Sequence, residues 1–177
     1  MSAEAKTRMT GELKEGVLAL APAQSVVTTR MTFDTSASKA WTSLMFYEEI
    51  GTRPPFYLRL LLPVPIGTEG KSATVGNEAK CLYEGGFLLK RTTNIQTDEL
   101  YEFEVVEQRL SIGGGMRLSG GRYTLRELPD GRTEVSIETR YTSTRRPRWF
   151  WKPMEAMVCH WFHRYLLASM RRKAIAH

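Results

Sequence analysis

The chain has 177 residues, of which 42% are hydrophobic and 25% charged, with a net charge of +6, values typical of one globular domain with a sizeable core. Its two cysteines, Cys81 and Cys159, have no metal-ligand spacing, so neither a disulfide framework nor a zinc site is indicated and a reducing compartment is expected. The longest apolar run, residues 60–66, contains two prolines and is far shorter than the ~20 residues of a membrane-spanning helix.

The first 23 residues mix charges with few large apolar side chains. They predict a flexible N-terminal arm ahead of a single domain over residues 24–177. A short apolar run at residues 16–22 follows Glu4, Glu12 and Glu15, whereas a signal peptide is basic and free of acidic residues at that place. We therefore expect a cytoplasmic protein.

The domain is predicted to begin with a strand and two short helices. Residues 25–33 alternate in character and are rich in β-branched side chains, which favours a strand. Residues 34–36 supply capping oxygens for a helix over residues 37–45. Prolines at 54, 55 and 63 delimit a second helix over about residues 55–62.

The segment from residue 73 to residue 144 is predicted to consist of strands. They span residues 77–83, 87–95, 100–108, 116–128 and 133–142. Glycine, proline and aspartate mark the short turns between them, so the strands form an antiparallel meander. Within the fourth of these strands, Ser119-Gly120-Gly121 indicates a bulge or bend where the sheet curls.

Residues from about 153 to 174 are predicted to form one long amphipathic helix. At about 100° per residue, one stripe of it consists of Met154, Met157, Val158, Trp161, Tyr165 and Ala168. So bulky an apolar stripe is expected to pack against the sheet. A single helix held by a curved sheet leaves an internal space between the two, and we expect the function there.

This order of elements resembles the START-like, or SRPBCC, superfamily of helix-grip proteins. Its members include polyketide cyclases and aromatases, lipid-transfer domains, coenzyme Q-binding proteins and birch-pollen-allergen proteins. Four runs carry the resemblance, which covers about residues 24–174: Phe33 to Trp41, Gly76 to Ala79, Leu100 to Val105, and Tyr123 to Leu125 followed by Asp130 to Val135. The resemblance implies an α+β fold in which a curved antiparallel sheet of six or seven strands wraps around the C-terminal helix, with a hydrophobic ligand between them.

The predicted ligand-binding residues come from the inward strand faces and from the helix stripe. They are Tyr83, Arg91, Tyr123, Tyr141, Met154, Met157, Trp161 and Tyr165. The tyrosines either place hydroxyls beside a ligand or pack in the core. Arg91 either holds a carboxylate or enolate in the cavity or reaches water at the open end of its strand.

No catalytic residue is assigned, and neither a cofactor nor a metal is predicted. His160 falls on the polar side of the helix and His163 on its flank. Their spacing presents two imidazoles to one metal, but a zinc or iron site usually needs further ligands, and none is evident on that face. Glu155, Cys159 and His163 are spaced four apart and are interpreted as neighbours that pack along one edge.

The basic residues concentrate at the end of the chain. Residues 140–177 carry a charge of +8, and the remainder of the chain carries −2. Ahead of the helix, cations alternate with aromatic side chains, namely Arg145, Arg146, Arg148, Trp149 and Trp151. This segment either seals the rim of the cavity or contacts an anionic membrane, while nucleic acid is not expected because a stacking platform is missing.

The sequence thus predicts a helix-grip domain that binds a small hydrophobic or amphipathic molecule, for transport or sequestration. Two alternatives remain open. One is an enzyme of the polyketide cyclase or dehydratase kind, in which Arg91 and inward tyrosines stabilise an enolate. The other is a lipid carrier that docks on anionic membranes through the segment from Arg145 to Lys152 and opens near residues 56–62.

Overall fold

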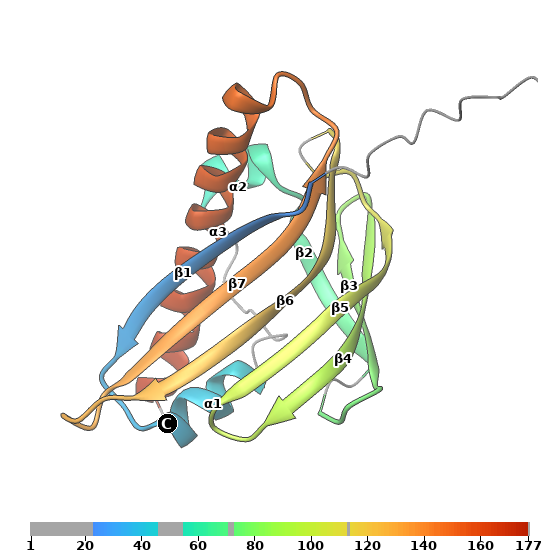
Figure 1. The fold of residues 1–177 in the computed structure, drawn as a ribbon. Coiled ribbons are helices and arrows are strands. Elements are labelled where there is room, and N and C mark those ends of the chain that lie inside the picture. Colours follow the sequence, from blue (N-terminus) through green and yellow to red (C-terminus); the bar gives the residue numbers. More distant parts are fainter. Residues whose placement is uncertain (1–22, 46–54, 71–72, 113, 177) are drawn as a thin grey trace, which may run out of the picture.

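The structure is a computed structural model and describes residues 23–45, 55–70, 73–112 and 114–176. Its elements are β1 (Ser25–Phe33), α1 (Ala37–Met45), α2 (Phe56–Leu61), β2 (Pro65–Gly70), β3 (Glu78–Tyr83), β4 (Gly86–Gln96), β5 (Leu100–Arg109), β6 (Met116–Glu127), β7 (Thr133–Ser143) and α3 (Arg148–Ala176) (Figure 1). Apart from its last residue, the predicted N-terminal arm lies outside the described residues.

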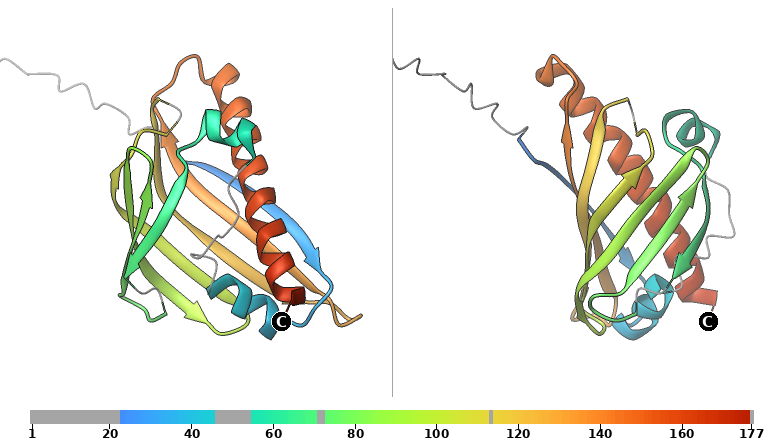
Figure 2. Two further views of the ribbon diagram at one scale, coloured as in Figure 1. Left: turned by 180° about the vertical axis from the view of Figure 1, so that it is seen from behind. Right: turned by 90° about the vertical axis from the view of Figure 1, so that its right-hand side faces the viewer.

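The seven strands form one antiparallel sheet in the order β1-β7-β6-β5-β4-β3-β2. The sheet curves, and α3 runs along its concave side, with α1 near one end of α3 and α2 near the other (Figure 2). The predicted α+β helix-grip architecture is confirmed. Strands with one apolar face and one polar face bury the apolar one, and here a single helix covers it.

The curvature is aided by a bulge in β6, as the sequence predicts. The pairing of β6 with β7 shifts its register between Leu118 and Gly120. A Cβ atom on Gly121 would lie 2.6 Å from the carbonyl oxygen of Glu138 and 3.0 Å from the ring of Phe103. The missing side chain therefore lets the Phe103 ring pack across β6 on the inside of the bend.

Two hydrophobic clusters fill the two ends of the space under the sheet. The cluster at the α1 end consists of Phe33, Ala40, Trp41, Leu44, Tyr101, Tyr123, Leu125, Val135, Ile137, Leu166, Leu167, Met170 and Ala174. The cluster at the α2 end consists of Val27, Cys81, Leu88, Leu110, Ile112, Met116 and Tyr141. Because α3 contributes four members to the first cluster and none to the second, the helix packs more closely at its C-terminal half.

Two element boundaries differ from the sequence prediction. The β2 strand was not predicted, because Pro-Ile-Gly-Thr-Glu-Gly has a single large strand-forming side chain, and its pairing with β3 outweighs this weak propensity. The α3 helix begins at Arg148 rather than near Pro153. Pro153 lies in the second turn, where its missing N–H removes only the hydrogen bond to the carbonyl of Trp149.

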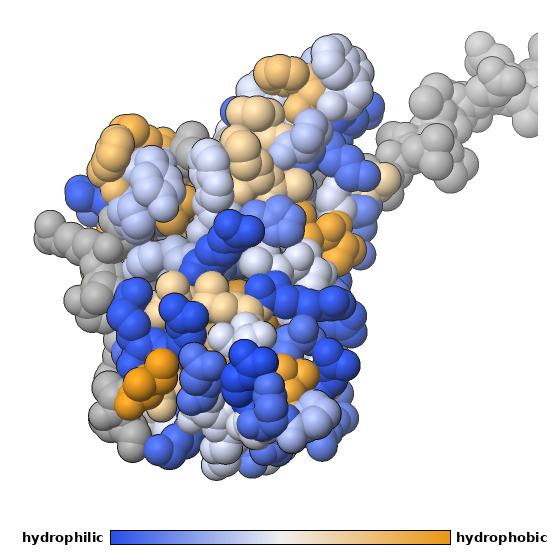
Figure 3. All heavy atoms as spheres, turned by 90° about the vertical axis from the view of Figure 1, so that its left-hand side faces the viewer, coloured by the Kyte–Doolittle hydropathy of each residue, from blue (hydrophilic) through white to orange (hydrophobic). Residues whose placement is uncertain are grey.

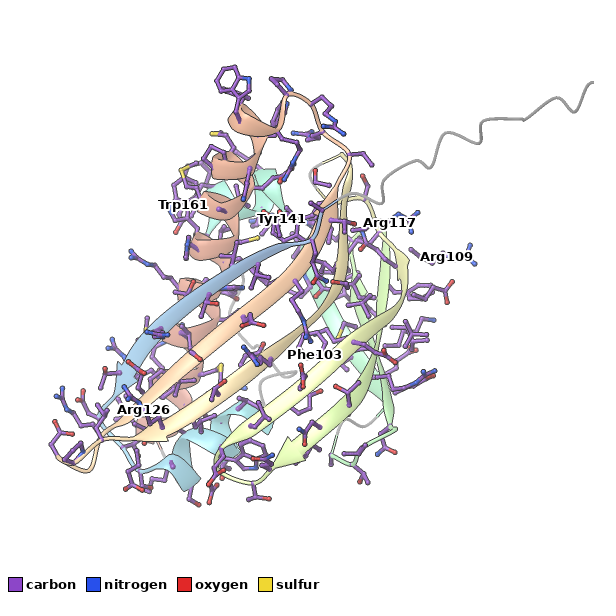
Figure 4. The ribbon with its side chains drawn as sticks, in the orientation of Figure 1. Phe103, Arg109, Arg117, Arg126, Tyr141 and Trp161 are labelled. Atoms are coloured by element: carbon purple, nitrogen blue, oxygen red, sulfur yellow. The ribbon has the colours of Figure 1, made fainter. Side chains whose placement is uncertain are left out.

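The predicted phase of the long helix was wrong. Trp161 and Met154 are 39% and 41% exposed, and Trp161 lies on the side of α3 turned away from the sheet (Figure 4). The buried positions of α3 are instead Glu155, His163, Leu166, Leu167, Ser169, Met170 and Ala174. The prediction assigned the buried face from hydrophobicity alone. It failed because the buried face contains polar residues, while large apolar residues lie on the outer face.

This correction predicts a contrast between two substitutions in α3. Leu167→Ala should lower the free energy of unfolding by about 2–5 kcal/mol, because Leu167 is fully buried in the α1-end cluster. Trp161→Ala should lower it by about 1 kcal/mol or less, mainly through loss of the edge-on contact with Tyr57. Urea unfolding of both variants tests the phase, and a larger loss for Trp161→Ala would contradict it.

Candidate functional site

A cavity of about 90 Å³ lies between α3 and the concave face of the sheet, beside the α2-end cluster. Strand residues Tyr83, Leu88, Met116, Leu118 and Thr139 form one wall. Val158, Cys159, Phe162 and His163 of α3 form the opposite wall, and Leu62, Pro63, Leu110 and Ile112 complete the lining. The lining is almost entirely apolar, and Tyr83, Thr139 and His163 are its residues with polar groups other than the Cys159 thiol.

His163 is the polar residue at the centre of this arrangement. It is 1% exposed, and both of its ring nitrogens have hydroxyl partners. Nδ1 lies 3.0 Å from Thr29 Oγ1 on β1, and Nε2 lies 2.8 Å from Thr139 Oγ1 on β7. Burial, together with the nearby His160, lowers the pKa of His163 to about 4. The ring is therefore neutral at pH 7 and ties α3 to two neighbouring strands.

His160 shares a partner with His163. The sequence places His160 on the polar side of the helix, and its side chain is indeed exposed. Its Nδ1 nevertheless lies 2.7 Å from Thr29 Oγ1, the same hydroxyl that contacts His163. The two histidines, one helical turn apart, thus meet at one threonine of β1.

A second polar cluster lies on α3 two turns before His163. Ser143 Oγ donates to Glu155 Oε1 at 2.6 Å, and Arg148 Nη1 donates to both carboxylate oxygens of Glu155 at 3.0 and 3.1 Å. These hydrogen bonds offset the desolvation cost of burying the Glu155 carboxylate. Burial and the charge of Glu155 raise the pKa of Cys159 to about 12, so its thiol stays protonated and is a poor nucleophile.

Glu155, Cys159 and His163 do lie along one edge of α3, as their spacing predicts, and this edge faces the sheet. Within the described part of the chain, no three His, Cys, Asp or Glu side chains are close enough to hold a metal ion.

The predicted tyrosines separate into different environments. Tyr83 lines the cavity. Tyr123 is buried in the α1-end cluster, and Tyr165 packs against the same cluster. Tyr141 is fully buried in the α2-end cluster, where burial raises the pKa of its hydroxyl to about 12. Of the four tyrosines, only Tyr83 lies where it contacts the contents of this cavity.

Arg91 does not face the cavity. It lies on the outer face of the sheet between Glu78 of β3 and Glu104 of β5, at 2.8 and 3.2 Å. This placement agrees with the solvent alternative and corrects the proposal that Arg91 supplies a charge to the cavity. Met154 and Trp161 likewise lie on the outer side of α3, and Met157 is half-buried outside the lining.

Lys90 is absent from the predicted set, although it is the cation that faces inward on β4. Strand alternation places it between the buried residues Leu88 and Thr92, and Nζ lies 4.8 Å from the centre of the Phe103 ring. Burial lowers the pKa of Lys90, but the negative charge that Cys81 and the neighbouring tyrosines carry when ionised raises it by more, so that it lies above its ordinary value. The alternation with Leu88 and Thr92 was the sequence signal that identifies this residue.

Comparison with known proteins supports the fold. No protein-family model matches the sequence, and no curated protein matches it. Truncated norcoclaurine synthase from Thalictrum flavum matches with a TM-score of 0.61 at 12% identity, over 89% of this chain and 98% of the synthase. The Zhui aromatase/cyclase from Streptomyces sp. R1128 matches with a TM-score of 0.57 at 13% identity, over 85% and 96% of the two chains. Ara h 8.0201 matches with a TM-score of 0.54 at 11% identity, over 88% and 100%. The chain therefore shares its fold with these three proteins, and this is the helix-grip fold that its sequence predicts.

The burial of His163 predicts a specific pH dependence of stability. Its pKa is lower in the folded than in the unfolded chain, so between about pH 6.5 and 4 the unfolded chain binds the additional proton. The free energy of unfolding is therefore highest above this range, where His163 is neutral in both states. It falls by about 3 kcal/mol as the pH is lowered through the range. Urea unfolding between pH 7 and 4 should show a flatter dependence for His163→Gln than for the wild type. His160→Gln serves as the control and should keep most of the wild-type slope. Equal slopes for His163→Gln and the wild type would contradict this prediction.

Proposed function

We propose that the protein binds a small hydrophobic or amphipathic molecule between α3 and the sheet. The observation that carries this proposal is the apolar cavity itself, which lies between α3 and the concave face of the sheet beside the α2-end cluster. Protein interiors normally leave few voids larger than a water molecule, and apolar cavities with a few polar groups are characteristic of ligand sites. The fold is shared with a synthase and an aromatase/cyclase, and this supports a small-molecule role. Cytoplasmic location stays a prediction.

The ligand enters past α2 in this proposal. A volume of about 90 Å³ is below the ~150 Å³ of an apolar cavity that accepts benzene, so a larger ligand needs part of the wall to move. Leu62 and Pro63 follow α2 directly and form part of that wall. The α2 helix has only six residues, contacts α3 through Tyr57 and Trp161, and has Leu58 as the buried one among its described side chains, so its displacement exposes little apolar surface.

The inward charge of Lys90 favours an amphipathic ligand with an acidic end. No carboxylate among the described residues pairs with Lys90, whereas Arg91 beside it pairs with two. An ammonium on an apolar face is stabilised when an anion reaches it. The apolar body of the ligand would occupy the cavity, while Tyr83, which lines the cavity and interacts electrostatically with Lys90, would contact its polar end.

Binding is tested with the neutral fluorescent probe N-phenyl-1-naphthylamine. We expect saturable binding to the wild type and at least about tenfold weaker binding to Val158→Trp, because an indole at this position fills the cavity. Met154→Trp places the same side chain on the exposed side of the same helix and should bind like the wild type. Equal affinity of Val158→Trp and the wild type would show that the probe binds elsewhere. Native mass spectrometry of freshly purified protein should show a co-purified small molecule that Val158→Trp lacks.

A second candidate function, a carrier that docks on anionic membranes, is favoured by one surface. Hydrophobic side chains gather in the upper part of the face shown in Figure 3, over α2 and the start of α3. Leu60 and Trp149 are each 79% exposed. The contact between Tyr57 and Trp161 joins the two helices into one apolar surface, and Arg59 and Lys152 add exposed positive charge to it. None of the described helices combines the length and hydropathy needed to cross a bilayer, so contact would be interfacial.

Within the basic aromatic segment from Arg145 to Lys152, some residues seal the rim of the cavity and others are exposed, as contact with a membrane requires. Trp151 is half-buried, donates from Nε1 to the carbonyl of Arg146 at 3.0 Å, and stacks under the guanidinium of Arg145 at 4.0 Å. Arg148 is engaged by Glu155. Both residues therefore belong to the packed rim. Trp149 is largely exposed, packs edge-on against Phe150, and is available to a membrane.

Docking predicts binding that depends on lipid charge. The wild type should co-sediment with anionic vesicles at low ionic strength, less so at physiological salt, and not with neutral vesicles. The double variant Leu60→Ala, Trp149→Ala should lose most of this binding, because both apolar anchors are removed. Ile175→Ala, at the opposite end of α3, removes an exposed apolar side chain outside the surface and should bind normally. No binding of the wild type to anionic vesicles at low salt would exclude the carrier.

A further inference from the structure

A continuous path of hydrogen bonds connects the outer surface of α3 to the cavity. It runs from the exposed His160 to Thr29 at 2.7 Å, from Thr29 to His163 at 3.0 Å, and from His163 to Thr139 at 2.8 Å. Its outer end is exposed to solvent and its inner end, His163 and Thr139, lines the cavity. If His163 served only to join α3 to the sheet, it would need neither the hydrogen-bonded imidazole of His160 nor a position in the cavity wall.

The chemistry of these groups allows few arrangements of hydrogens. The Thr29 hydroxyl has one hydrogen but contacts an Nδ1 atom of each histidine, so it donates to one and accepts from the other. Neutral His163 carries one ring hydrogen, so it donates at one nitrogen and accepts at the other. Two arrangements satisfy all these contacts. In one, every hydrogen bond points toward the cavity, and in the other, every one points toward solvent.

We propose that His160, Thr29, His163 and Thr139 form a proton relay between solvent and a molecule bound in the cavity. The proposal rests on the proposed ligand-binding function and adds acid-base chemistry to it. The ligand class is a hydrophobic molecule with an ionisable or enolisable group, such as a ketone, placed beside Thr139. The aromatase/cyclase and synthase that share the fold lend no residue to this inference, which stands on the three hydrogen bonds among these four residues.

The transfer balances without any further reactant. When the hydrogen bonds point toward the cavity, Thr139 gives its hydroxyl hydrogen to the ligand and takes the Nε2 hydrogen of His163. His163 takes the hydrogen of Thr29 at Nδ1, Thr29 takes the Nδ1 hydrogen of His160, and His160 takes a proton from water at Nε2. The ligand gains one proton, water loses one, and all bonds now point toward solvent. The reverse sequence removes a proton from the ligand, and no charge stays on the buried ring.

Of the other ionisable groups around this path, those on α3 and β7 are not available for proton exchange near neutral pH. On α3, Glu155 is held by Arg148 and Ser143, and Cys159 keeps its proton to about pH 12. On β7, Tyr141 also keeps its proton to about pH 12. Tyr83 of β3 faces the same cavity, and Lys90 of β4 lies on the same concave face. The buried residues of β1 beside Thr29 carry no ionisable side chain.

The relay has a consequence that is independent of any ligand. When His160 is protonated, both of its nitrogens carry hydrogen, and Thr29 must accept from it and donate to His163. His163 then carries its hydrogen at Nε2 only, and the Thr139 hydroxyl is released to donate into the cavity. When His160 is neutral, both arrangements are populated. Protonation of the surface histidine therefore selects the tautomer of the buried one.

Nitrogen-15 NMR of the histidine rings tests this coupling. As the pH is lowered from about 8 to about 5, His163 should shift from a mixture of tautomers to the Nε2-H form while it stays neutral. Thr29→Val should abolish the shift and Thr29→Ser, which keeps a hydroxyl, should restore it. Thr28→Val, on the opposite face of β1, is the matched control and should behave like the wild type. A His163 tautomer that is constant over this range in the wild type, or unchanged by Thr29→Val, would overturn the relay.

A second measurement examines transfer to a bound molecule. With 2-tetralone as the probe in deuterium oxide, the wild type should accelerate exchange of the protons beside the carbonyl, and Thr29→Val should reduce the acceleration at least tenfold. Saturation-transfer NMR reports binding of the same probe separately, so loss of exchange with retained binding identifies the relay as the failing part. Equal exchange in the wild type and Thr29→Val, with the probe bound to both, would contradict the proposal and leave ligand binding intact.

Discussion

The concave face of the sheet must be covered by one helix, and the rest of the structure depends on how α3 meets that constraint. Its C-terminal half packs Leu166, Leu167 and Met170 into the α1-end cluster. Its N-terminal half supplies Ala156 and Cys159 at the margin of the α2-end cluster and leaves a cavity there. A single straight helix cannot pack closely against a curved sheet along its whole length. The cavity therefore results from the arrangement of α3 and the sheet rather than from one small side chain.

Polar ties hold α3 at this distance from the sheet. Threonine hydroxyls of β1 and β7 form hydrogen bonds with His163, and Ser143 and Arg148 bind the carboxylate of Glu155. Buried polar groups fix one arrangement of their partners because each unmet hydrogen bond is costly. A helix held only by apolar contacts would be free to slide into the cavity. The same hydroxyls that position α3 therefore also place a neutral imidazole, with a path to solvent, at the cavity wall.

The strands were predictable because their side chains alternate, as in β1, where buried and exposed residues follow each other from Ser25 to Arg30. The phase of α3 was not, because its buried face contains His163 and Glu155 while its outer face carries Trp161 and Met154. Hydrophobicity alone cannot anticipate polar residues whose partners come from strands more than 100 residues away, as Thr29 does. On β4, the sequence predicted that Arg91 faces inward, but the inward cation is its neighbour Lys90. The reason is that Leu88 and Thr92, rather than Phe87 and Thr93, lie on the inward face of the strand. Tyr83, whose strand face also carries Cys81, lines the cavity.

An apolar cavity separates α3 from the sheet at the α2 end. Xenon enters such cavities without requiring any wall to move. A crystal exposed to xenon pressure should show one xenon atom among Leu88, Met116, Val158 and Phe162, and the same crystal of Val158→Trp should show none there. Absence of xenon from this position in the wild type, with the side chains of the two walls in direct contact, would contradict the claim.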